Sequence, residues 1–322
     1  MLSRVADSIY WMSRYVERAE NVARVISVNL NLSLDMPGEA GDQWWPPVVI
    51  TGDDAEFQSR IGSPTKEGVV EFLTFDDENP NSILSCLRAA RENARGVREI
   101  ISAEMWEHIN TFYLMVRDGG TLDDVLDNPH AFFERVNVSG QQFLGVTDAT
   151  MTHGEAWNFC RLGRMLERAD KTSRILDVKY FILLPKLADV GTPFDDIQWL
   201  ALLRSASGLE MYRQRHGRIS PVNVVDFLVL DREFPRAVLH CLTRANESLH
   251  AISGTYTGSY CNLAERRLGK LRAELAYTHA EDIIATGMHE FVDSLQTRLN
   301  LVGDAIHDCF FAMRPLELAS VR

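Results

Sequence analysis

The feature that most constrains this chain is that it repeats itself. The segment Arg14-Tyr15-Val16-Glu17-Arg18-Ala19-Glu20 returns 150 positions later as Arg164-Met165-Leu166-Glu167-Arg168-Ala169-Asp170. Further along, Val69–Glu92 matches Val224–Glu247 without a gap, and 12 of the 24 positions are identical. Similarity at a fixed spacing indicates a repeated structural unit, and each copy here is as long as a small domain. The chain is therefore predicted to consist of two fused, pseudo-symmetric halves.

The repeat also sets the expected domain organisation. A length of 322 residues allows two domains, but tandem copies often share one core. We expect residues 1–150 to form a first alpha-helical repeat and residues 151–322 a second, with the two packed as one compact body.

Helical periodicity dominates the sequence and predicts an all-α fold, a helical bundle. Apolar side chains recur every three or four residues from Ser3 to Leu32, and Met36-Pro37-Gly38 is expected to stop this helix. Asn79-Pro80 is typical of an N-cap followed by proline at the first helical position, and Phe234-Pro235 occupies the same place in the second copy. Further helices are expected at Pro80–Ser102, from Pro129 toward Gly145, and at Glu155–Leu184, Asn262–Tyr277 and Ala280–Met313.

The segments between these helices are less regular. Val69–Phe75 and Val224–Leu230 contain paired valines, but in helical surroundings we expect short buried helices rather than strands. Prolines and glycines in Pro37–Glu67 predict a loop, and Gly208–Pro221 is its counterpart in the second copy. The second loop is basic, because it carries Arg213, Arg215, His216 and Arg218.

Composition narrows the classes of partner and the compartment. A net charge of −12 argues against nucleic-acid binding, which requires clustered Lys and Arg. The five cysteines form no Cys-x-x-Cys pair, which is typical of a reduced, cytoplasmic protein. The first ten residues show no signal-peptide pattern, and the apolar runs are too short to span a bilayer. We expect a cytoplasmic protein with no membrane partner.

The repeated charged motif forms one polar stripe when it is placed on a helix. The charged side chains gather on one side of the helix, whereas Tyr15, Val16, Ala19 and Val22 fall on the other. Neighbours three or four residues apart in the stripe can touch. The candidate residues in the two copies are Arg14, Glu17, Arg18, Glu20, Arg24, Arg164, Glu167, Arg168, Asp170 and Arg174.

Three interpretations of the stripes are open. They can be solvated faces carrying weak ion pairs. They can instead face each other across the seam between the halves, as a buried Arg–Glu network that fixes the register. The third interpretation is functional: Arg14, Arg18, Arg164 and Arg168 line a cleft that grips a carboxylate or phosphate, because the planar guanidinium suits bidentate recognition of such groups.

Other candidate sites are weaker. Glu104, Glu107 and His108 lie close together on one expected helix, with His289 and Glu290 in the second half, but neither segment has the Glu-x-x-His pattern of di-iron sites. No Gly-rich phosphate loop, nucleophile elbow or His-Glu-x-x-His helix is present in the sequence. We therefore predict no catalytic residue, no metal and no cofactor.

The segment from Tyr10 to Asn21, Tyr-Trp-Met-Ser-Arg-Tyr-Val-Glu-Arg-Ala-Glu-Asn, resembles the bacterial alpha-E family of all-helical proteins named for a Glu-Arg motif. Glu167-Arg168-Ala169-Asp170 extends the likeness into the second half, where Cys160 and Arg161 replace the aromatic pair Tyr10-Trp11. The resemblance implies a gene neighbourhood shared with ATP-grasp-type ligases and transglutaminase-like peptidases, a system that makes or trims peptide amide bonds.

Two functions follow as hypotheses. The first is a non-catalytic helical partner of an ATP-grasp ligase and transglutaminase-like peptidase system, because the chain offers charge pairs but no recognisable nucleophile or base. The second is a binder or enzyme that uses the Arg/Glu cleft for an anionic peptide or nucleotide. The sequence does not indicate an oligomeric state.

Overall fold

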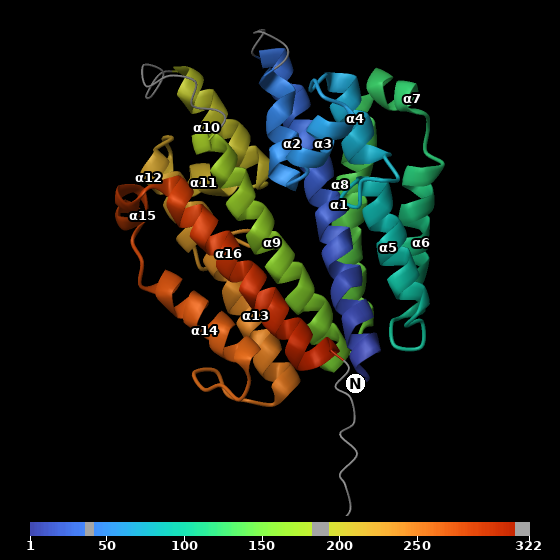
Figure 1. The fold of residues 1–322 in the computed structure, drawn as a ribbon, viewed down its shortest axis with the longest axis vertical. Coiled ribbons are helices and arrows are strands. Elements are labelled where there is room, and N and C mark those ends of the chain that lie inside the picture. The colour runs from blue at the N-terminus through green and yellow to red at the C-terminus, as the bar shows by residue number, and fades with distance from the viewer. Residues whose placement is uncertain (36–41, 182–192, 313–322) are drawn as a thin grey trace, which may run out of the picture.

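The structure, a computed structural model, describes residues 1–35, 42–181 and 193–312 (Figure 1). Helices make up nearly all of these ranges, and the one extended pairing there is an isolated bridge between Thr257 and Ser259. The predicted all-α class is confirmed.

The elements up to Thr150 begin with the long helix α1. They are α1 (Ser3–Asp35), the 3₁₀ turn η1 (Asp42–Trp44), α2 (Trp45–Thr51), α3 (Asp54–Arg60), α4 (Lys66–Thr74), α5 (Ile83–Arg95), α6 (Ala103–Arg117), α7 (Leu122–Asp127) and α8 (Pro129–Thr150). The expected first helix and the expected start at Pro129 are confirmed, although α8 continues to Thr150 rather than ending near Gly145.

The remaining elements begin with a second long helix, α9. They are α9 (Glu155–Phe181), α10 (Pro193–Ser205), α11 (Leu209–His216), α12 (Pro221–Val225), the π-helical turn η3 (Asp226–Leu230), α13 (Val238–Ser253), α14 (Leu263–Ala276), α15 (Ala280–Thr286), α16 (Met288–Ile306) and the π-helical turn η4 (His307–Phe311). The described part of α9 ends at Phe181, and residues 182–192 lie outside the described ranges.

The helices pack as two groups that meet at α1 and α9. In one group α1 contacts α5 and α8, and α6 packs against both α5 and α8 (Figure 1). In the other group α9 contacts α13 and α16, and α14 packs against both α13 and α16. The two long helices begin at the same end, where the amino group of Met1 lies 3.0 Å from the Glu155 carboxylate. Gly163 allows their close approach, because a Cβ at this position would lie 2.4 Å from the carbonyl oxygen of Tyr10.

Two predicted helix starts are wrong. Helix α5 begins at Ile83, where the Ser82 side chain accepts a hydrogen bond from the amide of Ser85. The Asn79 side chain, expected to cap a helix, instead accepts from the amide of Asn81 and donates to the carbonyl of Phe72. Helix α13 likewise begins three residues after Pro235, at Val238. Both prolines lie in turns before the helices, where local side-chain hydrogen bonds compete with helix formation.

The other corrections concern chain segments rather than fold class. The helix expected from Ala280 to Met313 is interrupted at Gly287, whose φ of +104° suits glycine, and Met313 lies outside the described residues. The loop expected at 37–67 contains η1, α2 and α3, because Pro46 and Pro47 fit the first turn of α2. The basic segment after Gly208 is helical in α11.

The two valine-paired segments are short helices, as expected. Val69 and Val70 are buried within α4, and Val224 and Val225 are buried within α12. Trp44 and Trp199, which are 155 residues apart like Val69 and Val224, are also buried. None of these segments pairs as a strand within the described ranges.

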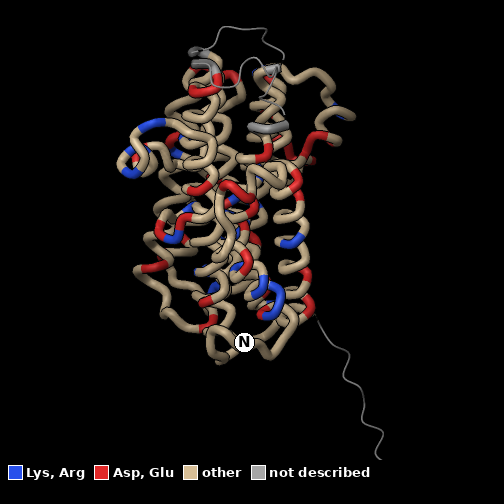
Figure 2. The backbone as a smooth tube through the Cα atoms, turned by 90° about the vertical axis from the view of Figure 1, so that its left-hand side faces the viewer, with Lys and Arg blue, Asp and Glu red and all other residues tan. Residues whose placement is uncertain are grey.

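Charged residues are distributed along the helices. Figure 2 shows acidic and basic positions interleaved along the tube rather than sorted onto separate sides. Within the described ranges, every helix is too short or too polar to cross a membrane.

Candidate functional site

The two repeated motifs lie opposite each other, because α1 and α9 pack side by side at the centre of the molecule (Figure 1). Glu17 and Glu167 point into this contact, and their exposed fractions are 2% and 0%. Such burial leaves neither carboxylate on a solvated face. An ionised carboxylate in this position requires partners, because isolated buried charges are very costly.

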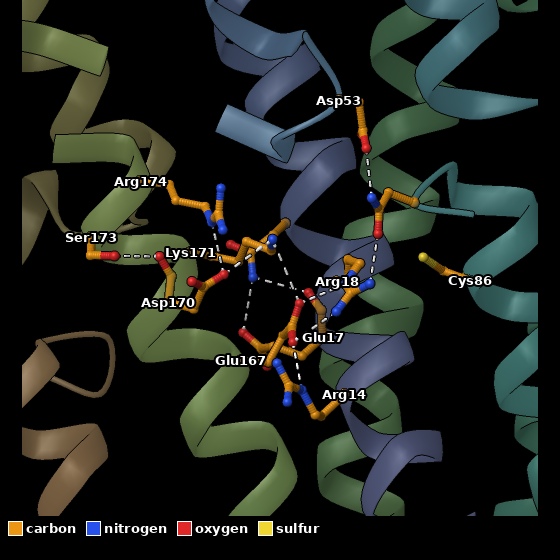
Figure 3. A network of polar contacts seen from close by, with 12 residues as sticks. Arg14, Glu17, Arg18, Asp53, Cys86, Glu167, Asp170, Lys171, Ser173 and Arg174 are labelled. Carbon is orange, nitrogen blue, oxygen red and sulfur yellow. Dashed lines mark hydrogen bonds and ion pairs between the residues drawn. The ribbon is translucent and has the colours of Figure 1, made fainter. Parts of the chain in front are cut away.

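Glu167 of α9 receives two arginines from α1. The Nε atoms of Arg14 and Arg18 each lie 2.7 Å from one of its oxygens, and Nη2 of Arg18 donates at 3.2 Å (Figure 3). The remaining Arg18 nitrogen donates to the Asn81 side chain at 2.6 Å, and Asn81 in turn donates to Asp53 at 2.6 Å. Glu167 is therefore bound by one nitrogen of Arg14 and two nitrogens of Arg18, and Arg18 is in turn held by Asn81.

Glu17 of α1 has the reciprocal arrangement. Arg168 of α9 donates to both of its oxygens, at 2.9 and 2.7 Å. Arg236 donates to Glu17 at 2.7 Å and to Glu20 at 2.7 Å, so that it ties both carboxylates to the turn before α13. Arg24 pairs with Glu20 and donates to Asn21. The Glu17–Arg18 dipeptide is thus crossed with the Glu167–Arg168 dipeptide.

These contacts set the ionisation of the site. Burial by itself raises the pKa of the Glu167 carboxyl, but the charges of Arg18 and Arg14 outweigh it and hold the pKa well below its usual range. Burial raises the pKa of Glu17 in the same way, and the charges of Arg168 and Arg236 lower it further than burial raises it. Both carboxylates are ionised at neutral pH.

Of the Glu-Arg dipeptides in the sequence, Glu17-Arg18 and Glu167-Arg168 are paired crosswise between α1 and α9, and two others are not. Glu134-Arg135 is exposed on α8, and Arg266 points to solvent next to the buried Glu265. A sequence model of a family described as a predicted alpha-helical domain with a conserved ER motif matches residues 1–311. The chain belongs to this family, Alpha-E.

Similarity to curated proteins adds distant relatives of uncharacterised function. An uncharacterised protein of Mycobacterium bovis and one of Mycobacterium tuberculosis are each 23% identical to this chain over 300 residues. These matches cover 87% of this chain but 33% of each relative, so the chain spans about a third of their length. No solved structure matches the chain.

The Alpha-E motif also borders a cleft. A cavity of 520 Å³ opens beside Glu167, between α1, α9 and α16. Its lining includes Tyr10 and Trp11, the aromatic pair that the second copy of the motif lacks. The guanidinium carbon of Arg14 lies 4.8 Å from the centre of the Trp11 ring, so it stacks over this wall of the cleft. The remaining lining residues are Arg18, Thr51, Gly52, Asn81, Leu166, Asp170, Lys171, Arg174, Leu299, Asn300, Gly303, Asp304, His307 and Phe311.

Two cations of α9 face the cleft with unused hydrogen-bonding capacity. The side chain of Lys171 is 8% exposed, and its Nζ lies 3.3 Å from Asp170 and 3.7 Å from Glu167. Arg174 is 26% exposed and donates from Nε to Asp170 at 3.0 Å (Figure 3). Among the described residues, no hydrogen bond uses the terminal nitrogens of Arg174 or Nζ of Lys171.

The cleft lies on one side of the crossed pairs because the two sides carry different residues. Asn81 and Arg236 occupy the same position in the gapless repeat. The longer Arg236 covers Glu17 and Glu20, whereas Asn81 leaves the Glu167 side open. Helix α8 also closes the Glu17 side, since a Cβ on Gly140 would lie 2.8 Å from Cγ of Glu20. On α16, by contrast, a Cβ on Gly303 would meet nothing within 4 Å.

The sequence candidates therefore have different surroundings. Arg14, Arg18, Asp170 and Arg174 line the cleft, and Glu167 lies beneath them. The closed side holds Glu17, Glu20, Arg24 and Arg168, and burial together with Arg236 lowers the pKa of Arg24 to about 10. For Arg164, burial lowers the pKa, and its Nε has no hydrogen-bond partner among the described residues.

Three residues of the network were missed from the sequence: Asn81, Lys171 and Arg236. The aligned repeats contained a signal for two of them, because Asn81 and Arg236 directly follow the shared proline and differ in charge. Lys171 follows Asp170 but has a neutral counterpart, Asn21, in the first copy, so the repeat did not single it out.

The weaker metal candidates are not brought together. His108 donates from Nε2 to the carbonyl of Ser139 at 2.8 Å, and His289 pairs with Asp177 at 2.7 Å. Within the described ranges, no group of three His, Cys, Asp or Glu side chains is arranged to hold a metal ion.

Proposed function

We propose that this Alpha-E chain is a binding protein whose cleft holds an anionic group, a carboxylate or phosphate, of a peptide or nucleotide-like ligand. The observation that carries the proposal is Lys171. Its side chain is more than nine-tenths buried, yet the nearest carboxylate oxygens lie 3.3 and 3.7 Å from its ammonium nitrogen. Buried charges are ordinarily satisfied by close hydrogen bonds, so this side chain has donors available for a ligand in the cleft.

The balance of charge in the cleft supports an anion. Four cations line it, namely Arg14, Arg18, Lys171 and Arg174, against the lining carboxylates Asp170 and Asp304 and the underlying Glu167. Arginine and lysine side chains of this kind suit carboxylate and phosphate groups. A volume of 520 Å³ falls within the range of about 300–1,000 Å³ typical of small-molecule sites.

The proposal assigns the crossed carboxylates a positioning role rather than a catalytic one. Glu17 and Glu167 are fully engaged by arginines, and their lowered pKa keeps them ionised, so neither is poised to exchange a proton near neutral pH. The nearby thiol of Cys86 is a poor nucleophile, because burial raises its pKa to about 12.

Calorimetric titration tests the binding proposal. Glutarate and inorganic phosphate serve as probes for the wild type and for Arg174→Gln and Lys171→Gln. Hydrogen bonds to charged groups contribute about 1.5–3 kcal/mol, so each substitution is expected to weaken binding about tenfold or more. Arg117→Gln is the matched control, because Arg117 is exposed on α6 and pairs with the adjacent Asp118.

The binding proposal is wrong if neither probe binds the wild type at millimolar concentration. It is also wrong if both cleft variants bind as tightly as the wild type, because the ligand would then lie elsewhere.

We further propose that the chain acts as an accessory partner of an ATP-grasp-type ligase and a transglutaminase-like peptidase. This proposal rests on the family resemblance, and the lengths of the mycobacterial relatives support it. The matched region makes up 33% of those chains, so this helical unit occurs there together with other sequence. In this role the cleft would present an anionic peptide to the partner.

Co-purification tests the accessory role. The chain is purified with an ATP-grasp protein encoded beside it, and ATP turnover by that protein is measured with and without the wild type. Co-elution and a change in turnover are expected, and both are expected to weaken with Arg18→Ala combined with Arg168→Ala. Separate elution with unchanged turnover contradicts the role.

We also infer that the chain arose by duplication of one helical unit. We infer separately that it acts in the cytoplasm. The 12 identities in 24 aligned positions support the duplication, as does the parallel order of helix contacts in the two groups. Three buried free thiols, Cys86, Cys160 and Cys241, fit a reducing compartment.

A further inference from the structure

The lining of the cleft is divided by charge. All four of its lysine and arginine side chains, Arg14, Arg18, Lys171 and Arg174, come from α1 or α9. The wall formed by α16 and η4 contributes Leu299, Asn300, Gly303, Asp304, His307 and Phe311, with Asp304 as its carboxylate and neither Lys nor Arg. On α9 the lining carboxylate Asp170 is paired with Lys171 and Arg174, so the four cations leave this wall with a net positive charge. This wall is therefore suited to an anion and the opposite wall to a cation.

Asp304 is available to a ligand. It is exposed, and none of the ion pairs within the described ranges involves its side chain. The absence of a side chain on Gly303 leaves open space beside it, because a Cβ there would meet nothing within 4 Å. His307 lies one helical turn further along the same wall.

A second carboxylate adds negative charge behind this wall. Asp7 of α1 lies near His307 and Trp11, and its Oδ1 is buried without a hydrogen-bond partner among the described residues. Burial raises the pKa of Asp7, and the charge of His307 and a hydrogen bond from Trp11 oppose this effect. The end of the cleft near His307 thus has one lining carboxylate, Asp304, with Asp7 behind the wall, whereas the end near Lys171 is lined by two cations.

We propose that the cleft recognises a zwitterion, a free amino acid or short peptide whose carboxylate binds at Lys171 and Arg174 and whose ammonium group binds at Asp304. This inference rests on the proposed anion-binding function and names its ligand class. Leu166, Leu299 and the Trp11 ring, which also line the cleft, provide apolar surface for the body of the ligand. Opposed charges at two ends also fix the direction in which a peptide lies.

The experiment uses alanine peptides of two to four residues in three forms: unmodified, N-acetylated and C-amidated. Affinities for the full-length chain are measured by calorimetric titration, with glutarate as the probe for anion binding alone. For at least one length, the unmodified peptide is expected to bind at least tenfold more tightly than either modified form. Asp304→Asn is expected to remove the preference over the acetylated form while glutarate binding is retained.

Asp308→Asn provides the matched control, because Asp308 is exposed four residues further along and does not line the cleft. This variant is expected to keep the full preference for the free ammonium group. Thermal melting of all variants checks that they fold.

The outcomes separate the two proposals. If acetylated and unmodified peptides bind equally, or if glutarate binds and no peptide does, the zwitterion is wrong and the anion site stands. If neither glutarate, phosphate nor any peptide binds, the proposed function itself fails. If Asp304→Asn keeps the preference, the ammonium group is not recognised by the α16 wall and the inference is overturned.

Discussion

Substitution of Glu167 by glutamine tests whether the crossed ion pairs hold the molecule together. Glu167 is fully buried and accepts three hydrogen bonds, at 2.7, 2.7 and 3.2 Å, from Arg14 and Arg18. Removal of its charge leaves two guanidinium groups and the Lys171 ammonium facing each other without their common counter-ion.

The expected magnitude follows from this geometry. Breaking one partner of a buried ion pair costs about 3–5 kcal/mol, and glutamine retains part of the hydrogen bonding, so we expect the lower end, about 3 kcal/mol. For a chain of this size 1 kcal/mol corresponds to about 2 °C, which gives a fall in melting temperature of roughly 6 °C. Because total stabilities are only about 5–15 kcal/mol, such a loss is large.

Urea denaturation followed by circular dichroism measures the change in the free energy of unfolding. The matched control is Glu134→Gln, which alters an exposed Glu-Arg dipeptide on α8 and is expected to change stability by no more than about 0.5 kcal/mol. If Glu167→Gln costs less than about 1 kcal/mol, or no more than the control, the crossed pairs do not stabilise the contact between α1 and α9.

Three further predictions concern the same network. Glu17 and Glu167 have lowered pKa values, so their contribution to stability is present above the usual carboxyl pKa of about 4.3 and is lost as pH falls below it. Between pH 6 and pH 3.5 the free energy of unfolding is therefore expected to fall less for Glu167→Gln than for the wild type, and equal falls would contradict this. Gly140→Ala places a Cβ 2.8 Å from Glu20 and is expected to lower the free energy of unfolding in urea by about 1–3 kcal/mol. Gly145→Ala on the same helix meets nothing within 4 Å and is expected to be neutral or stabilising, so similar values for both would refute the tight packing of α8. Arg236→Asn gives Arg236 the residue type of its repeat counterpart Asn81 and removes the donors to Glu17 and Glu20. Thermal melting is expected to show a loss of stability of about 2–4 kcal/mol, and an unchanged melting temperature would show that Arg236 is dispensable.

The fold class followed from the sequence because its signals were long and periodic. The described part of helix α1 continues past the predicted end at Leu32 to Asp35, and the expected stop at Met36-Pro37-Gly38 lies outside the described residues. The helix itself was predictable because its apolar spacing is sustained. The predicted starts of α5 and α13 were wrong because local side-chain hydrogen bonds hold a turn before each helix. Before α5 these bonds are made by Asn79, and Ser82 offers a later cap. Before α13, Asp231 accepts from the amides of Glu233 and Phe234. The interruption at Gly287 was missed because a single glycine is often tolerated within a helix.

The candidate site was likewise predictable in part. The helical stripe placed Glu17, Arg18, Glu167 and Arg168 on one face of each helix, as the repeat indicated. The sequence did not indicate which side of the crossed pairs would be open, because that depends on Asn81 opposite Arg236 and on the approach of α8 and α16. The α16 wall of the cleft, including Asp304, was not predictable from the motif, because it lies more than 100 residues after the second Glu-Arg dipeptide.

A double-mutant cycle on the unfolding free energy tests the central claim most directly, namely that the two Glu-Arg dipeptides are paired crosswise between α1 and α9. Glu17 with Arg168, and Glu167 with Arg18, are expected to show coupling of about 1–3 kcal/mol when each is replaced by an uncharged residue. The sequence neighbours Glu17 and Arg18 are expected to couple by less than about 0.5 kcal/mol. Strong coupling within each dipeptide and none across the two helices would contradict the account.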